Sequence, residues 1–238
     1  MTEAPKKVIG VLGGMGPLAT QIFYGMVIEN TAAERDQDHI DMIILSSASI
    51  PDRTEALLSG KTEQLYDALA GGCAFLEKSG VSHIVIPCNT SHFFIDRLKS
   101  VTGVPIINMI REAAEAVAPA GKKGMKVGIL ATTGTVKTGL YQTELKKAGQ
   151  IPVIPSDENQ SLVMKIIYEG IKGGGEIDLC EFRKIEKELL DEGCERVIMG
   201  CTELSCFMKI YKLPELFYFD AMKILALKAI DAAGGRIK

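Results

Sequence analysis

The sequence predicts an α/β protein of two pseudo-symmetric, doubly wound domains with mainly parallel sheets and an interdomain cleft. Apolar, β-branched runs alternate with amphipathic stretches of helical spacing along the whole chain. Strands that are continuously apolar are typical of parallel sheets covered on both faces. Two further observations agree: the 238 residues exceed one domain of about 150, and the two halves share sequence patterns.

The expected elements alternate in order along the chain. The expected strands are Val8–Leu12, Met42–Leu45, His83–Ile86, Val104–Ile107, Lys126–Leu130 and Arg196–Met199. A helix follows the glycine turn after the first strand, and the other expected helices are Lys61–Lys78, Ile110–Ala118, Leu140–Ala148, Leu162–Ile171, Leu179–Glu192 and about Asp220–Ala233. We expect the last helix to fold back onto the first half. The predicted domains are therefore 1–103 plus about 215–238, and 104–214.

The internal similarity places two cysteines in matched positions. Lys7–Gly13 (KVIGVLG) corresponds to Lys126–Ala131 (KVGILA), and His83–Thr90 (HIVIPCNT) corresponds to Arg196–Thr202 (RVIMGCT). In the second pair, each strand ends at a cysteine that small polar residues follow. Because such folds bind ligands outside the carboxyl ends of their strands, two facing halves would bring both cysteines to one cleft.

Composition excludes several classes of protein. Hydrophobic residues make up 47% and charged residues 24% of the chain, so it is not disordered. A net charge of −3 gives no basic footprint for nucleic acid. With three histidines and no C-x-x-C spacing, a metal site is not expected. The six cysteines are interpreted as thiols of a cytoplasmic protein.

The N-terminal region resembles a signal peptide, because Lys6 and Lys7 precede the uncharged run Val8–Ile28. Several glycines and Pro17 interrupt this run, and no cleavage pattern follows it. We therefore interpret it as a buried strand, a glycine turn and a helix, and expect neither export nor a membrane segment.

The glycine turn fits the opening of a dinucleotide fingerprint, G-x-G-x-x-A, in Gly14–Ala19 (GMGPLA). Pro17 suits the first helical position, where backbone N–H groups can bind an anion. The acidic residue that holds a ribose is missing, since the next strand ends in Leu45–Ser49 (LSSAS). This disfavours a nicotinamide cofactor; a carboxylate-binding turn is favoured, and a purely structural turn is the alternative.

Cys88 and Cys201 are the most specific signal. Each follows an apolar strand at a loop expected to begin a helix, where the helix dipole lowers the pKa of a thiol and favours thiolate. Their neighbours are polar, whereas Cys73 and Cys194 are expected to pack among hydrophobic residues.

Several motifs resemble those of the cofactor-independent aspartate/glutamate racemase family: Gly13–Pro17 (GGMGP), Pro51–Thr54 (PDRT), Pro87–Thr90 (PCNT), Ala131–Thr135 (ATTGT) and Gly200–Glu203 (GCTE). The resemblance runs from about Val8 to beyond Asp220. It implies two α/β domains around a catalytic cleft, no cofactor, and usually a homodimer. It also implies aspartate as the substrate, with glutamate as a second candidate. Ser91 and Ser205 depart from the family, where alanine and proline are common.

The resemblance implies that Cys88 and Cys201 exchange acid and base roles, Cys88 deprotonating the D-isomer and Cys201 the L-isomer. Inverting an α-carbon without a cofactor requires removing a proton from one face and delivering one to the other, and two groups across a cleft can do so. The same resemblance implies that Arg53 and a lysine of the second domain bind the two substrate carboxylates. Lys172 is the best match by position, and Lys165 is the alternative.

Hydroxyl and amide groups near the cysteines are expected to donate hydrogen bonds to the α-carboxylate. Glu203 is expected either to accept the substrate ammonium or simply to begin a helix. The complete set of expected substrate-binding residues is Met15, Arg53, Asn89, Thr90, Thr133, Thr135, Lys172, Thr202 and Glu203.

His92 allows two interpretations, a Cys-His dyad with Cys88 or a position on the outer helix surface, and the second is favoured. Two other functions compete with racemisation. One is isomerase or lyase chemistry on another small carboxylate, and the other is non-catalytic ligand binding in the same cleft.

Overall fold

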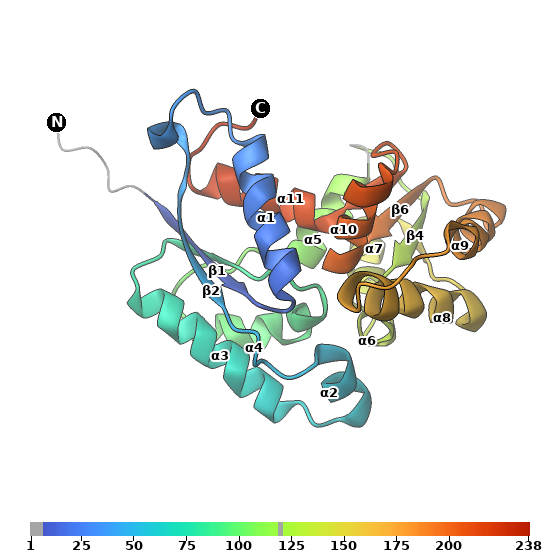
Figure 1. The fold of residues 1–238 in the computed structure, drawn as a ribbon, viewed down its shortest axis with the longest axis horizontal. Helices are drawn as coiled ribbons and strands as arrows, with labels where there is room; N and C mark the ends of the chain where they lie inside the picture. The colour runs from blue at the N-terminus through green and yellow to red at the C-terminus, as the bar shows by residue number, and fades with distance from the viewer. Residues whose placement is uncertain (1–6, 119–120) are drawn as a thin grey trace.

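The computed structural model describes residues 7–118 and 121–238. Residues 1–6, with Lys6 and the start of the expected first domain, and residues 119–120 lie outside this description. The described residues form two parallel sheets, one in each half of the molecule (Figure 1). The α/β class with mainly parallel sheets is confirmed.

The first sheet has the strand order β2-β1-β3. Its strands are β1 (Val8–Gly13), β2 (Asp41–Ser46) and β3 (His83–Val85). The helices of this half are α1 (Pro17–Asn30), η1 (Asp36–Asp38), α2 (Arg53–Ser59), α3 (Glu63–Lys78), η2 (Thr90–Phe94) and α4 (Ile95–Lys99). Strand β1 is buried from Ile9 to Gly13, which explains its continuous apolar sequence.

The second sheet has the strand order β5-β4-β6-β7. Its strands are β4 (Lys126–Leu130), β5 (Ile151–Val153), β6 (Arg196–Met199) and β7 (Tyr218–Asp220). The later helices are α5 (Met109–Val117), α6 (Thr133–Lys137), α7 (Leu140–Lys147), α8 (Asp157–Lys165), the π-helix η3 (Ile166–Lys172), α9 (Leu179–Asp191), α10 (Thr202–Tyr211) and α11 (Ala221–Ala232).

Two expected elements differ from the structure. Val104–Ile107 is not a strand, and its pairing with the first sheet is limited to a bridge between Ile84 and Ile106, because Pro105 has no N–H to extend the ladder. The helix expected over Leu162–Ile171 begins earlier, at Asp157, where Ser156 caps it by accepting from the Asn159 N–H. It becomes a π-helix from Ile166.

The end of the chain is shared between the two halves. Residues from about 215 were expected to return to the first half, but β7 pairs with β6 of the second sheet. The Tyr218 ring is buried and lies 5.8 Å from the Phe182 ring of α9, which anchors this strand. Helix α11 then packs against α1 and α5.

One hydrophobic cluster joins the two halves. It includes Ile9 of β1, Val127 of β4, Tyr141 of α7 and Ala229 of α11, and each of these is fully buried. Helices α5 and α11 lie between the two sheets in this core (Figure 1). None of the helices in the described part of the chain is long and apolar enough to span a bilayer.

Candidate active site

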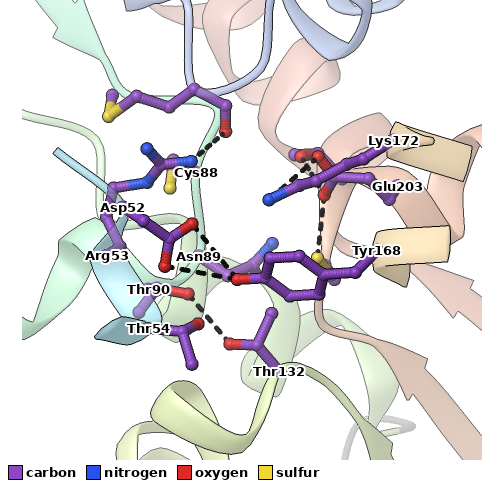
Figure 2. Close-up of a pocket in the computed structure, with 13 residues that line it drawn as sticks. Asp52, Arg53, Thr54, Cys88, Asn89, Thr90, Thr132, Tyr168, Lys172 and Glu203 are labelled. Carbon is purple, nitrogen blue, oxygen red and sulfur yellow. Dashed lines mark hydrogen bonds and ion pairs between the residues drawn. The ribbon is translucent and has the colours of Figure 1, made fainter. Parts of the chain in front are cut away.

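A small polar cavity lies where the two halves meet (Figure 2). Its volume is about 10 Å³, close to the space that one water molecule needs. The residues that line it come from the ends of strands and the starts of helices in both halves: Met15, Asp52, Arg53, Thr54, Cys88, Asn89, Thr90, Thr132, Tyr168, Lys172, Cys201, Thr202 and Glu203. Both matched cysteines therefore face one cavity.

The chain places each cysteine just beyond a central strand. Cys88 follows β3, and its N–H donates to the carbonyl of Ile86 at 2.7 Å. Cys201 follows β6 and is the N-cap residue of α10. Each is 6% exposed. Cys73 and Cys194 are buried in hydrophobic clusters, as predicted, and do not line the cavity.

Cys201 is held as a protonated thiol. Its Sγ donates to Oε2 of Glu203 at 2.9 Å. Burial, followed by the charge of Glu203, raises the pKa of Cys201 well above that of a free thiol. The sequence predicted that the helix start would favour thiolate here. That prediction is wrong for Cys201, because burial and a carboxylate outweigh the helix dipole.

Cys88 lies beside a cation instead. Burial lowers the pKa of Arg53, but the charge of a Cys88 thiolate and that of Asp52 outweigh burial and raise this pKa. The Arg53 guanidinium donates to the carbonyls of Ile50, Pro51 and Met15 at 3.4, 3.1 and 3.2 Å. An arginine has five N–H donors, so donors remain for a ligand. The Cys88 thiol therefore lies beside a positive charge, and the Cys201 thiol lies beside a negative one.

The two candidate lysines occupy different places. Lys172 lines the cavity, and its Nζ lies 3.8 Å from Oε1 of Glu203 and 4.3 Å from the centre of the Tyr168 ring. Burial lowers the pKa of Lys172, but the charge of Glu203 outweighs burial and raises it. Lys165 is paired with Glu181 at 2.8 Å outside the cavity lining.

Four lining residues were not among the expected site residues: Asp52, Thr54, Thr132 and Tyr168. The Tyr168 hydroxyl donates to Asp52 at 3.3 Å to Oδ1 and 3.2 Å to Oδ2, which links η3 to the start of α2 across the cavity (Figure 2). Asp52 and Thr54 belong to the PDRT motif quoted above. Tyr168 precedes Lys172 by about one helical turn, and that spacing was the available signal.

The threonines of the ATTGT motif are arranged differently from the expectation. Thr132 lines the cavity, whereas Thr133 and Thr135 do not. Thr132 caps α6 by accepting from the Thr135 N–H, so its hydroxyl lies at the cavity side of the helix start. The Thr135 hydroxyl lies behind it, 2.8 Å from that of Thr90. Thr135 therefore supports two lining residues rather than facing the cavity.

The position of His92 corrects both interpretations made from the sequence. It is 1% exposed and does not lie on an outer surface. Its Nδ1 is 2.9 Å from the Cys88 carbonyl, and its Nε2 accepts from the Met109 N–H at 3.1 Å. Both ring nitrogens are therefore occupied by backbone groups, and the ring is not paired with the Cys88 thiol. His92 anchors the loop that carries Cys88.

The glycine turn after β1 is held by a side chain of α1. Gly14 has a φ of 90°, and its N–H donates to the Thr20 hydroxyl at 2.8 Å. Met15, the next residue, lines the cavity. The Gly14 N–H is thus engaged within the turn. Within residues 7–118 and 121–238, no group of three or more His, Cys, Asp or Glu residues is arranged to hold a metal ion.

Comparison with known proteins gives consistent results. The model of the Asp/Glu/hydantoin racemase family matches residues 12–229. The structure of Picrophilus torridus aspartate racemase superposes with a TM-score of 0.80 and 31% identity, over 98% of this chain and 96% of that one. The broad-specificity amino-acid racemase RacX of Bacillus subtilis is 29% identical over 84% of this chain and 87% of its own. A glutamate racemase of Persephonella marina is 29% identical over 65% of this chain and 60% of its own.

Proposed function

Because this chain belongs to the Asp/Glu/hydantoin racemase family, we propose that it racemises aspartate without a cofactor, by proton transfer between substrate and the thiols of Cys88 and Cys201. Glutamate is the second substrate. The observation that carries the proposal is that both thiols line one cavity between the halves. Cys88 lies at one side of this cavity, and Glu203, which accepts from the Cys201 thiol, lies at the other (Figure 2).

The different surroundings of the two thiols suit a reaction that needs one base and one acid at a time. Arg53 is the cation beside Cys88, while burial and Glu203 keep Cys201 protonated. In this state Cys88 removes the α-proton from the D-isomer, and Cys201 delivers its proton to the opposite face. Reaction of the L-isomer begins with the charges reversed.

Stabilising the carbanion is the main difficulty. If an amino-acid α-proton is about ten units less acidic than a thiol, the mismatch is roughly 14 kcal/mol. Donors aimed at the α-carboxylate lower this barrier, because negative charge develops there in the transition state. Asn89, Thr90 and Thr202 line the cavity and are the donors we assign to this carboxylate.

Two cations support a dicarboxylate as the substrate. Arg53 and Lys172 both line the cavity, and two cations match the two carboxylates of aspartate. Glu203 lies 3.8 Å from Lys172 and completes the charged set as the acceptor for the substrate ammonium. The similarity to an aspartate racemase over nearly the whole of both chains supports aspartate, and the similarity to a glutamate racemase supports glutamate as the second substrate.

The test follows the α-hydrogen in deuterated water. Wild-type protein is expected to exchange the α-hydrogen of L- and D-aspartate for deuterium and to destroy optical activity. Cys88→Ala and Cys201→Ala are each expected to lose racemisation while remaining folded by circular dichroism. Cys180→Ala is the matched control, because Cys180 is exposed and outside the cavity.

Three results would overturn parts of the proposal. Wild-type protein that binds aspartate but exchanges no hydrogen would be a ligand-binding relative. If the protein turned over another small carboxylate and incorporated no deuterium into aspartate, the result would indicate different isomerase or lyase chemistry. Appreciable racemisation by either cysteine variant would contradict the two-thiol scheme.

A further inference from the structure

A buried hydrogen bond between the two halves ends at one of the cavity residues. The Tyr141 hydroxyl of α7 lies 2.5 Å from Oδ1 of Asn89, which follows Cys88. Tyr141 is fully buried and Asn89 is 2% exposed. Tyr141 itself does not line the cavity, and its hydroxyl donates to the side chain of a residue that does.

The direction of this hydrogen bond is fixed by its surroundings. Burial raises the pKa of Tyr141 well above its usual value, and the charges of Asp220 and Cys201 add to this effect. The phenol therefore stays protonated and donates, and Asn89 must accept with its carbonyl oxygen. The amide nitrogen of Asn89 is then turned away from Tyr141.

The amide nitrogen of Asn89 has no hydrogen-bond partner among the described residues, although it is buried. Figure 2 shows this nitrogen turned toward the space between the two halves, and Asn89 is one of the residues that line the cavity there. A buried NH₂ group without an acceptor is unfavourable, and an acceptor oxygen on a ligand removes that penalty. The orphaned donor thus indicates where a ligand oxygen lies.

We propose that Tyr141 is a positioning residue that holds Asn89 with its NH₂ group facing the cavity, where it donates to a substrate carboxylate. The identity of the substrate in this statement rests on the proposed function. Without the Tyr141 hydroxyl, the amide of Asn89 is free to rotate and present its oxygen, which would repel a carboxylate. Tyr141 therefore acts on substrate binding through Asn89.

The backbone beside Cys201 is shaped around Tyr141. A Cβ atom added to Gly200 would lie 2.6 Å from Cε2 of the Tyr141 ring. The tyrosine can reach Asn89 past the end of β6 only because the residue before Cys201 has no side chain. The same ring therefore contacts the strand end that carries one thiol and the residue that follows the other.

The experiment measures L-aspartate binding by calorimetry in a background of Cys88→Ala and Cys201→Ala, which cannot turn the ligand over. Tyr141→Phe is expected to weaken binding about tenfold, equivalent to about 1.4 kcal/mol. Asn89→Ala is expected to weaken it similarly, and the variant with both changes is expected to bind no more weakly than Asn89→Ala. Tyr24→Phe removes a hydroxyl at an exposed site and is the matched control.

Asn89→Asp adds a sharper comparison. An aspartate at this position still accepts from Tyr141 but presents a second carboxylate oxygen to the cavity. Binding of L-aspartate is expected to be lost while thermal stability is retained. If the losses from Tyr141→Phe and Asn89→Ala add in full, or if Tyr141→Phe binds and racemises like wild type, the positioning role is wrong.

A readout without substrate separates this inference from the proposed function. The side-chain NH₂ resonances of Asn89 in ¹⁵N-labelled protein are assigned by their loss in Asn89→Ala. They are expected to be distinct and sharp in wild type and to shift or broaden in Tyr141→Phe. Unchanged resonances would overturn the inference, whatever the substrate is. Failure of wild type to exchange aspartate hydrogen would overturn the proposed function alone.

Discussion

The thiol of Cys201 donates a hydrogen bond to Oε2 of Glu203, two residues further along α10, at 2.9 Å. The acceptor is a carboxylate, and its other oxygen lies 3.8 Å from Lys172. A thiolate at Cys201 would therefore face a negative charge inside a buried site. The protonation of this cysteine depends on a residue within its own motif.

Replacing Glu203 is expected to make Cys201 more acidic. Burial and the Glu203 charge both raise the pKa of Cys201, so Glu203→Gln removes one cause and the pKa falls. If it falls by about one unit, the thiolate fraction at a fixed pH rises about tenfold. Alkylation of Cys201 by iodoacetamide, followed by peptide mass spectrometry between pH 6 and pH 10, measures this. The exposed variant Glu215→Gln is the control, and coincident pH profiles would contradict the prediction.

The two candidate lysines are expected to differ in their effect on substrate binding. Lys172→Met keeps most of the apolar stem but removes the charge from the cavity, so KM for aspartate is expected to rise at least about tenfold. Lys165→Met removes a charge whose partner is the surface residue Glu181 and is expected to leave kinetics unchanged. Steady-state racemisation assays on both variants check this. Equal kinetics for the two would remove Lys172 from the site.

Replacing Gly14 or Gly25 by alanine is expected to change the free energy of unfolding in opposite directions. Gly14 has a φ of 90°, and a Cβ there would lie 2.4 Å from the backbone nitrogen of Ser47. Gly14→Ala is therefore expected to lower the free energy of unfolding by about 2 kcal/mol or more. Gly25 lies inside α1 with open space around it, so Gly25→Ala is expected to raise it by about 0.5–1 kcal/mol. Urea titrations measure both, and a stable Gly14→Ala protein would refute the first expectation.

Protonation of His92 is expected to destabilise the fold in acid. Burial lowers its pKa to about 4 from 6.5, and a protonated Nε2 could no longer accept from the Met109 N–H. Above about pH 6.5 the ring is neutral in both states and pH has no effect through this group. As pH falls from about 6.5 to 4, the unfolded chain binds a proton that the folded chain does not, and stability drops by about 3 kcal/mol.

The check on His92 is the pH dependence of chemical denaturation. His92→Gln removes the titrating group, so the fall in unfolding free energy across this window is expected to shrink. His39→Gln, at a less buried histidine, is the control and is expected to retain the wild-type slope. An unchanged slope in His92→Gln would contradict the assignment.

The strands buried in the middle of the sheets could be predicted from sequence, because both of their faces are covered. Val8–Leu12 is nearly the whole of β1. The edge strand β5 has three residues and contains a proline, so its pattern carries too little information. Val104–Ile107 is apolar for another reason: it packs beside the first sheet, where Pro105 prevents regular pairing.

Some residues of the site could likewise be predicted from the sequence, and others could not. The cysteines could be predicted because two matched strand ends repeat the same local pattern. Asp52 and Tyr168 were missed because their hydrogen bond joins residues 116 positions apart, and the local signals at each residue, the PDRT motif and the spacing to Lys172, do not pair them. The burial of His92 also depends on the approach of the chain around Met109, which is set by tertiary packing rather than by helical spacing.

The cavity between the halves has room for about one water molecule, and any amino acid is several times larger. In Figure 2 the hydrogen bonds from Tyr168 to Asp52 join the two halves beside this cavity. Under the proposed function, the cavity is therefore expected to enlarge before substrate binds and again before product leaves. If the proposed function holds, raising the solvent viscosity is therefore expected to slow turnover through this enlargement as well as through any effect on the chemical step.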